Sequence, residues 1–394
     1  MITADTELGH LLDELLSESP HRTIERARTA YDQFAGGLPT EVVIAGAGQL
    51  GRFVFPGVRA AGLNPLAYCD NNSSLWGTQI EGVPVMSPAA AVERYGDRAC
   101  FLTAIYNPSA ITRQLRELGC TRIVPYPAFF WKFSAVLSDE RLDLPNRILQ
   151  QIDGMRPAYD LLADDTSRRE FCAQLRWRCF LDYDCLPRPE PSKEMYFPRE
   201  LFRLSPDEVL VDCGAFDGDS LGAFVEKVDG RFQHIYAVEP DPGNIRALRT
   251  YLDTLPEDVA ARITILQYAL GRGGGTVRFE AAGSVGSKIV ESGGTVEVQC
   301  QSLDGGLGAN VRPTLIKMDI EGAELDAIAG AAQTIADCRP IMAVCAYHHC
   351  SDLWILPGLL KAAYPEYQIF LRRYAEECWE TVYYAVPPDR LERS

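Results

Sequence analysis

The sequence lacks the long apolar segment that a membrane helix requires. None of its apolar runs reaches the roughly 18 residues that are needed to span a bilayer. The amino-terminal stretch MITADTELGHLLDELL is acidic and lacks the basic region with which a signal peptide begins. The sequence therefore predicts no membrane span, no secretion signal and a cytoplasmic protein.

Positive charge is scarce as well. The chain has 38 Lys and Arg against 54 Asp and Glu, which gives a formal net charge of −16 over 394 residues. A surface of that sign repels phosphate backbones and anionic lipids. Nucleic acid is therefore not expected as a partner, and a small molecule or a sugar is the expected substrate. A homodimer stays open.

Closely spaced cysteine pairs are also absent. The twelve cysteines are spread singly and no C-x-x-C pair occurs, which is typical of reduced, buried thiols. The stretch Cys345-Ala-Tyr-His348-His349-Cys350 contains residue types that bind zinc. In a strand, however, Cys345 and His349 share one face and His348 lies on the other, so we do not expect a structural zinc site.

What the sequence has in abundance is alternation between strand and helix patterns. This alternation predicts an α/β fold with two Rossmann-like units joined by a helical connector. At about 100–200 residues per domain, the length corresponds to two or three domains. We expect amino-terminal helices at 1–37, a Rossmann-like domain at 38–129, the connector at 130–200 and a second α/β domain at 201–394.

The second α/β domain is expected to contain seven strands. They are predicted at 208–213, 234–239, 263–270, 314–320, 341–347, 367–373 and 381–386. Helices are predicted at 218–228, 242–253, 322–335 and 352–363. The Gly-rich segment 271–303 carries two alternating stretches, TVRFEA and TVEVQC, which predict a hairpin-like insertion.

The first strand of this domain leads into an acidic glycine turn. The stretch VLVDCGAFDGDSLGAF has the pattern of a buried strand, a turn and the start of a helix, and it carries Asp212, Asp217 and Asp219. Three carboxylates would repel a pyrophosphate. The spacing Asp212-x-Gly214-x-x-x-Gly218 also lacks the tight G-x-G of a pyrophosphate-binding turn. The turn therefore favours a ligand without phosphate.

The next strand supplies an acid suited to a ribose. Glu239 follows Asp212 by about the interval that separates the glycine turn from the ribose-binding acid in dinucleotide-binding domains. Open α/β sheets bind ligands at the carboxyl ends of their strands, where both residues would lie. S-adenosylmethionine has a ribose, an ammonium and a sulfonium but no phosphate, so it is the cofactor that this edge predicts.

Several motifs of this half occur in the same order in a known family. They are VDCGAFDGDS, YAVEPDP, YALG, IKMDIEGAELDAI, AYHHCSDLWILP, YQIFLRRY and TVYYAV. Through these motifs, residues 195–387 resemble the FkbM-type S-adenosylmethionine-dependent methyltransferase family. The resemblance implies a class I methyltransferase fold, in which a seven-stranded sheet has an antiparallel last strand. It also implies O-methylation of hydroxyls on sugars, glycans or secondary metabolites.

The resemblance also implies roles for single residues. Gly214 would let the backbone approach the methionine part of the cofactor, Asp212 would hold the ammonium, directly or through water, and Glu239 would bind the ribose. Ala269 and Leu270 would lie near the adenine. The full set of expected cofactor-binding residues is Asp212, Gly214, Ala215, Phe216, Asp217, Gly218, Glu239, Pro240, Ala269, Leu270 and Asp319.

Methyl transfer to a hydroxyl also needs a proton acceptor. His348 follows the fifth strand and is the first candidate, and Asp319 is the second. Glu321 is expected to face the site with Asp319. As an alternative, Asp319, Glu321 and His348 could bind Mg²⁺ or Mn²⁺. Arg372 and Arg373 could contact a substrate phosphate or pair with acidic groups.

The first Rossmann-like unit carries a fingerprint of its own. Gly46-x-Gly48-x-x-Gly51 lies between a strand and a helix, and Asp70 closes the next strand. The unit resembles the small Rossmann-like domains of sugar-modifying transferases. Three interpretations stay open: binding of a nucleotide-sugar, a scaffold or dimer contact, and, least expected, binding of NAD(P). The corresponding alternatives for the protein are an NAD-dependent oxidoreductase or epimerase of a sugar nucleotide and a non-catalytic nucleotide-sugar-binding protein.

Overall fold

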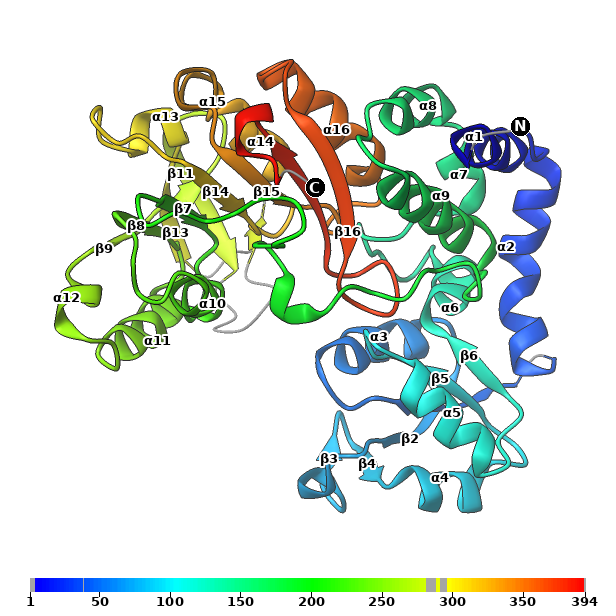
Figure 1. Ribbon diagram of the computed structural model, residues 1–394. Coiled ribbons are helices and arrows are strands. Elements are labelled where there is room, and N and C mark those ends of the chain that lie inside the picture. The colour runs from blue at the N-terminus through cyan, green and yellow to red at the C-terminus, as the bar shows by residue number, and fades with distance from the viewer. Residues whose placement is uncertain (1–3, 38, 281–287, 291–295, 393–394) are drawn as a thin grey trace. The chain divides into compact units, whose positions relative to one another are not determined.

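The computed structural model describes residues 4–37, 39–280, 288–290 and 296–392 (Figure 1). The chain forms two compact units, each assembled from three segments. The first unit comprises Met1–Ile152, Cys172–Pro189 and Ala375–Trp379, and the second comprises Asp153–Phe171, Glu190–Tyr374 and Glu380–Ser394. The domain boundaries at residues 37, 129 and 200 stay a prediction.

The first unit is built on a six-stranded sheet in the order β3-β4-β2-β1-β5-β6. All neighbouring strands pair in parallel except β3 with β4. The strands are β1 (Glu41–Ala45), β2 (Asn64–Cys69), β3 (Gln79–Ile80), β4 (Val83–Met86), β5 (Cys100–Thr103) and β6 (Ile123–Pro125). The helices are α1 (Ala4–Leu16), α2 (Pro20–Ala35), α3 (Gln49–Ala60), α4 (Pro88–Tyr95), α5 (Ser109–Glu117), α6 (Tyr126–Phe133) and α7 (Pro145–Leu149).

The amino-terminal helices expected within residues 1–37 are α1 and α2 in the structure. Ser19 has extended backbone and Pro20 opens α2, because proline fits the first turn of a helix, where its missing N–H has no intrahelical partner. Gly36 ends α2 in the left-handed conformation, which glycine adopts without strain. The predicted connector is also helical, with α8 at Ile152–Asp160 and α9 at Asp165–Phe180.

The second unit contains the seven-stranded sheet that the sequence predicts. Its order is β16-β17-β15-β14-β7-β8-β9; β17 pairs antiparallel with both β15 and β16, and all other neighbouring strands pair in parallel. The strands are β7 (Val209–Cys213), β8 (His234–Val238), β9 (Ile263–Leu266), β14 (Leu315–Met318), β15 (Ile341–Cys345), β16 (Gln368–Arg373) and β17 (Thr381–Val386). Apolar runs such as those of β7 and β15 are buried along their whole length, as expected for strands covered on both faces.

The helices of the second unit that follow α9 lie between these strands in the sequence. They are α10 (Asp219–Lys227), α11 (Pro242–Leu252), α12 (Glu257–Ala260), α13 (Leu303–Gly306), α14 (Glu324–Ala329), α15 (Ala332–Cys338) and α16 (Asp352–Ala363). The single helix predicted at 322–335 was wrong. It is split into α14 and α15 around Gly330, where a Cβ atom would lie 2.2 Å from the carbonyl oxygen of Gly271.

A smaller four-stranded sheet accompanies the large one, in the order β10-β13-β11-β12. Its strands are β10 (Ala269–Leu270), β11 (Gly275–Glu280), β12 (Lys288–Val290) and β13 (Val296–Gln301). The antiparallel pairing of β11 with β13 confirms the hairpin-like insertion for its described residues, while 281–287 and 291–295 lie outside them. The strand predicted at 263–270 is two strands, β9 and β10, which belong to different sheets. Of the helices described, none has the length and apolar character to cross a membrane.

Candidate functional site

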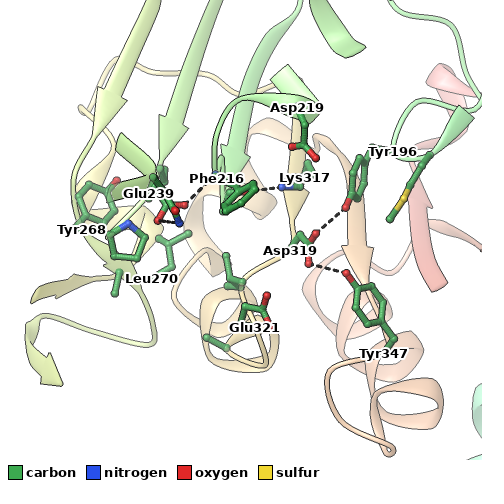
Figure 2. Close-up of a pocket in the computed structure, with 18 of the residues that line it drawn as sticks. Tyr196, Phe216, Asp219, Glu239, Tyr268, Leu270, Lys317, Asp319, Glu321 and Tyr347 are labelled. Atoms are coloured by element: carbon green, nitrogen blue, oxygen red, sulfur yellow. Dashed lines mark hydrogen bonds between the residues drawn. The ribbon is translucent and has the colours of Figure 1, made fainter. Parts of the chain in front are cut away.

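A cavity of about 290 Å³ opens in the second unit, at the carboxyl ends of β7, β8 and β14 (Figure 2). This is the edge at which open α/β sheets bind their ligands. Figure 2 shows two groups of side chains at opposite sides of the cavity. We call Glu239, Tyr268 and Leu270 the Glu239 end, and Tyr196, Asp319 and Tyr347 the Asp319 end. The lining residues are Met195, Tyr196, Gly214, Phe216, Asp219, Val238, Glu239, Pro240, Asn244, Tyr268, Ala269, Leu270, Lys317, Asp319, Ile320, Glu321, Ala323, Tyr347 and Glu380.

Glu239 is held in place at the first of these ends. Its Oε1 accepts hydrogen bonds from the Asp241 N–H at 2.8 Å and from Asn244 Nδ2 at 3.2 Å, and its Oε2 accepts one from the Phe216 N–H at 3.0 Å. Burial raises the pKa of Glu239, and the three donors oppose that rise because they stabilise the ionised form. A carboxylate has about four lone-pair positions, so Glu239 keeps acceptor capacity for a ligand.

The glycine turn after β7 closely approaches the backbone at the end of the neighbouring strand β14. Gly214 has a φ of +81°, and a Cβ atom there would lie 1.9 Å from the carbonyl oxygen of Asp319. Lys317 Nζ donates a hydrogen bond of 2.7 Å to the Gly214 carbonyl. The glycine is therefore required by the turn itself, and the turn is tied to β14 by a lysine side chain.

Of the two contacts expected for Asp212, direct or through water, the structure argues against the direct one. Its side chain is 1% exposed, does not line the cavity, and forms an ion pair with Lys317, with 3.0 Å between Asp212 Oδ1 and Lys317 Nζ. The Ser220 hydroxyl donates to Asp212 Oδ2 at 2.7 Å. Burial alone would lower the pKa of Lys317, but the carboxylate of Asp212 raises it, so the lysine stays charged. A direct contact between Asp212 and a cofactor ammonium is therefore not supported, and a contact through water stays a prediction.

Of the other residues expected to bind the cofactor, some line the cavity and some do not. Phe216 lines the cavity, as do Pro240, Ala269 and Leu270. Ala215, Asp217 and Gly218 are not among the lining residues. Asp217 is exposed and Ala215 is fully buried.

The cavity is acidic, but not through the three aspartates of the turn. Only Asp219 of those three lines it. The other carboxylates of the wall are those of Glu239, Asp319, Glu321 and Glu380, and the one amine among the described lining residues belongs to Lys317. Since Asp212 already balances Lys317, the wall carries an excess of negative charge. The site therefore carries negative charge, as predicted, but most of its carboxylates come from residues outside the glycine turn.

Asp319 organises the second end of the cavity. Its Oδ2 accepts a hydrogen bond of 2.7 Å from the Tyr196 hydroxyl, and its Oδ1 accepts one of 3.2 Å from the Tyr347 hydroxyl (Figure 2). Burial would raise the pKa of Asp319, but Lys317, His348 and the Tyr196 hydrogen bond hold it below its usual range. Asp319 is therefore ionised, and its lowered pKa makes it a weak proton acceptor.

His348 lies behind this end, beside three carboxylates. Its Nδ1 lies 2.9 Å from Glu324 Oε1, and its Nε2 lies 3.3 Å from Asp319 Oδ1 and 3.7 Å from Glu321 Oε2. Burial alone would lower the pKa of His348, but these carboxylates raise it to about 10. The imidazole therefore carries a proton at neutral pH. In this state it cannot accept one, which argues against the expected role of His348 as the base.

Backbone strain is concentrated in the wall of the cavity. Eight non-glycine residues of the described chain have positive φ, and four of them line the cavity: Tyr196 (67°), Phe216 (46°), Glu321 (55°) and Glu380 (50°). Such backbone conformations are costly for residues with a side chain and gather at functional sites. Half of the strained non-glycine positions in the described chain therefore lie in the wall of this one cavity, which is typical of a functional site.

Glu380 is a carboxylate that sequence reasoning missed. It lines the cavity, and within the described part of the chain its carboxylate has no hydrogen bond or ion pair. Burial raises its pKa, and the neighbouring charge of Asp319 raises it further. Lys317, Tyr196 and Tyr347 were missed as well. Lys317 could have been found from the sequence. Side chains of a strand alternate between its two faces, so Lys317 lies on the same face as Asp319 in the stretch IKMDI.

Arg372 and Arg373 pair with carboxylates. Arg372 Nη2 lies 2.7 Å from Asp164 Oδ2 and its Nε lies 2.5 Å from Glu200 Oε1, while Arg373 Nε lies 2.7 Å from Glu170 Oε1. Both arginines are buried. Of the two expected roles, pairing with acidic groups is the one that the structure contains.

Contacts within the first unit explain its glycine fingerprint without a ligand. A Cβ atom at Gly51 would lie 1.9 Å from the carbonyl oxygen of Gly46, so close strand–helix packing requires the glycine. Asp70 accepts hydrogen bonds of 2.8 Å from the backbone N–H groups of Ala47 and Asn72. A nucleotide site at Gly46, Gly48, Gly51 and Asp70 stays a prediction.

Comparison with known proteins supports the sequence resemblance. Residues 212–354 match the model of the methyltransferase FkbM domain. The structure is similar to the crystal structure of methyltransferase FkbM from Methylobacillus flagellatus KT, with 25% identity and a TM-score of 0.73 over 97% of this chain and 99% of that chain. No curated protein sequence matches the chain.

Two further crystal structures are more distant. Precorrin-6y C5,15-methyltransferase from Geobacter metallireducens GS-15 has 14% identity and a TM-score of 0.31, over 47% of this chain and 83% of that chain. Fibrillarin from Aeropyrum pernix, with natively bound S-adenosyl-L-methionine, has 12% identity and a TM-score of 0.30, over 49% of this chain and 73% of that chain. These scores are too low to support any argument. The family match and the first structure support the same assignment. Residues 212–354 form a methyltransferase FkbM domain, and this range includes strands of the sheet whose edge forms the cavity.

Proposed function

We propose that the protein is an S-adenosylmethionine-dependent O-methyltransferase that acts on a hydroxyl of a sugar, a nucleotide-sugar or a glycosylated metabolite. One observation carries the proposal above the others. Glu239 lies at the carboxyl end of β8, is oriented by three hydrogen-bond donors and faces an acidic cavity. The expected cytoplasmic location and homodimer remain predictions.

The donor set of the cavity fits this cofactor. S-adenosylmethionine supplies a methyl group on a positively charged sulfur. At the Glu239 end, the Glu239 carboxylate would accept hydrogen bonds from the ribose hydroxyls, and Ala269 and Leu270 offer apolar surface to the base. The hydroxyl of Tyr268 at the same end is buried and has no hydrogen-bond partner in the described part of the chain, so it could donate to a ligand.

The charge of the wall disfavours NAD in the place of S-adenosylmethionine. NAD carries a diphosphate, which would lie close to carboxylates such as those of Asp219 and Glu239, and the one lysine among the described lining residues is already paired with Asp212. Like charges at this range disfavour binding strongly when water is excluded. An oxidoreductase acting through this cavity is therefore the weaker candidate.

The Asp319 end would receive the acceptor hydroxyl. Tyr196 and Tyr347 are fixed by their hydrogen bonds to Asp319 and shape this end. Glu380 has an unengaged carboxylate in the same wall, so it is our candidate for the group that takes the proton from the acceptor hydroxyl. A polyhydroxyl acceptor suits an end that is rich in carboxylate oxygens, because these accept hydrogen bonds from hydroxyl groups.

Calorimetric titration with S-adenosylhomocysteine tests the proposal. The wild-type chain should bind it, and Glu239→Gln should weaken binding by about 2–4 kcal/mol, the scale for removing one charged partner from a buried contact. Glu226→Gln, an exposed carboxylate on α10, is the matched control and should bind as the wild type does. Saturable binding of NAD in place of S-adenosylhomocysteine, or equal affinities of Glu239→Gln and the wild type, would contradict the proposal.

A further inference from the structure

We propose that the chain holds one divalent cation between Asp319, Glu321 and the Nε2 atom of His348, with Glu324 fixing the imidazole from the other side. Asp319 and Glu321 line the cavity, so the ion would lie in its wall. One ligand atom each from Asp319, Glu324 and His348 already falls within 4.8 Å of the others.

The donor atoms are spaced as the ligands of one ion require. His348 Nε2 lies 3.3 Å from Asp319 Oδ1 and 3.7 Å from Glu321 Oε2. Neighbouring ligands of an octahedral ion with bonds of about 2.1 Å lie roughly 3 Å apart. A shift of roughly 0.3 Å for Asp319 and of roughly 0.7 Å for Glu321 would bring both to that spacing from His348 Nε2, and both carboxylates line the cavity.

A buried carboxylate without a partner gives independent support. The side chain of Glu324 is 1% exposed, and its Oε2 has no hydrogen-bond partner among the residues that the structure describes. The Oδ1 atom of Asp352, whose carboxylate interacts electrostatically with Glu324, is buried without a partner as well. Buried charges are normally paired or coordinate metals. Three carboxylates thus lie within 3.7 Å of one imidazole, and a doubly charged ion would balance them better than a proton does.

Glu324 is placed to orient the histidine. Its Oε1 lies 2.9 Å from His348 Nδ1 and accepts a hydrogen bond of 2.9 Å from the Ile320 N–H. A histidine that binds a metal through one nitrogen usually donates the other N–H to such a carboxylate, which fixes its tautomer. Glu324 is therefore a positioning residue, and the ligands are Asp319, Glu321 and His348.

The residue types select among ions. Two carboxylates and one imidazole, with open positions for water or substrate, suit Mn²⁺ best and Mg²⁺ next. The presence of the site is independent of the proposed reaction. Its use, to bind the acceptor hydroxyl and to favour loss of its proton, rests on the proposed function.

Mn²⁺ is the probe for the test. Full-length protein, stripped with a chelator, is titrated with Mn²⁺ while the free ion is followed by electron paramagnetic resonance, with and without S-adenosylhomocysteine. We expect one saturable Mn²⁺ per chain, displaced by excess Mg²⁺. Glu321→Gln, at a partly exposed position, should weaken binding at least tenfold, and Glu324→Gln should weaken it by about 10–100-fold, the usual effect of losing the carboxylate behind a ligating histidine. Glu226→Gln should bind as the wild type does.

The outcomes separate the two proposals. Absence of saturable Mn²⁺ binding to the wild type, or equal affinity in Glu321→Gln, Glu324→Gln and the wild type, overturns the cation site. Thermal unfolding of each variant establishes that it is folded when it is titrated. If S-adenosylhomocysteine does not bind but Mn²⁺ binds and is lost in the two variants, the proposed function fails and the cation site stands.

Discussion

Replacement of Lys317 by methionine should destabilise the second unit, by an amount that depends on pH. The variant removes the ion pair with Asp212 and the hydrogen bond to the Gly214 carbonyl. Both side chains of the pair are almost fully buried, at 2% and 1% exposed. Asp212 would be left with the Ser220 hydroxyl as its partner among the described residues. Breaking a buried pair from one side costs about 3–5 kcal/mol.

Protonation of Asp212 sets the upper limit of that cost. A carboxyl with an ordinary pKa of about 3.9 can be protonated at pH 7 for about 4 kcal/mol, and at pH 5 for about 1.5 kcal/mol. In the variant the folded pKa of Asp212 would be raised, so the folded state would bind more protons than the unfolded state, and stability would fall as pH rises. We therefore expect a deficit of about 3–4 kcal/mol at pH 7 that shrinks to about 1–2 kcal/mol at pH 5.

Hydrogen exchange in urea measures the effect where it should occur. The opening free energies of amides in β7 and β14 are compared between the wild type, Lys317→Met and the double variant Asp212→Asn with Lys317→Met, after correction for the intrinsic rate at each pH. The double variant should recover part of the loss, because no charge stays buried without a partner. Lys193→Met, at an exposed position, should change stability by less than about 0.5 kcal/mol. A single-variant loss below about 1 kcal/mol at pH 7, or a loss equal at the two pH values, would refute the reasoning.

Two other predictions follow from single side chains. Glu380→Gln should keep its affinity for S-adenosylhomocysteine while transfer of a labelled methyl group to sugar acceptors falls by about 10²–10⁴-fold, because the proton acceptor is gone; undiminished transfer would exclude Glu380 from that role. In the first unit, burial raises the pKa of Glu377 from 4.5 to about 7, and Trp379 Nε1 donates to its carboxylate at 2.8 Å. Since the folded state then binds the extra proton, the stability of this unit should fall by roughly 3 kcal/mol between pH 4 and pH 8. Glu377→Gln should remove most of that pH dependence in urea unfolding, and the same slope in both proteins would contradict the assignment.

The sheets could be predicted from the sequence because their information is local. Buried parallel strands such as β7 and β15 appear as short apolar runs, and helix ends such as that at Gly36 have residues suited to the turn. The break between β9 and β10 and the break between α14 and α15 could not be predicted in this way. The latter depends on contact between Gly330 and the carbonyl of Gly271, two residues that no local pattern connects.

The site was predictable to a similar degree. Glu239 and Gly214 were found because the interval from a glycine turn to a ribose-binding acid is fixed by the fold. Asp212 was assigned to the ligand because its partner, Lys317, lies more than a hundred residues away in the sequence. The charge state of His348 is set by Glu324, Asp319 and Glu321, which belong to another segment, so its residue type alone suggested a base.

The central claim is that the cavity of the second unit binds a positively charged, phosphate-free nucleoside through Glu239. A crystal structure of the full chain with S-adenosylhomocysteine tests this most directly. We expect both ribose hydroxyls within hydrogen-bond distance of the Glu239 carboxylate and the sulfur between the Glu239 and Asp319 ends of the cavity. Ligand density at another place in the chain, or a diphosphate against the turn at residues 212–219, would contradict it.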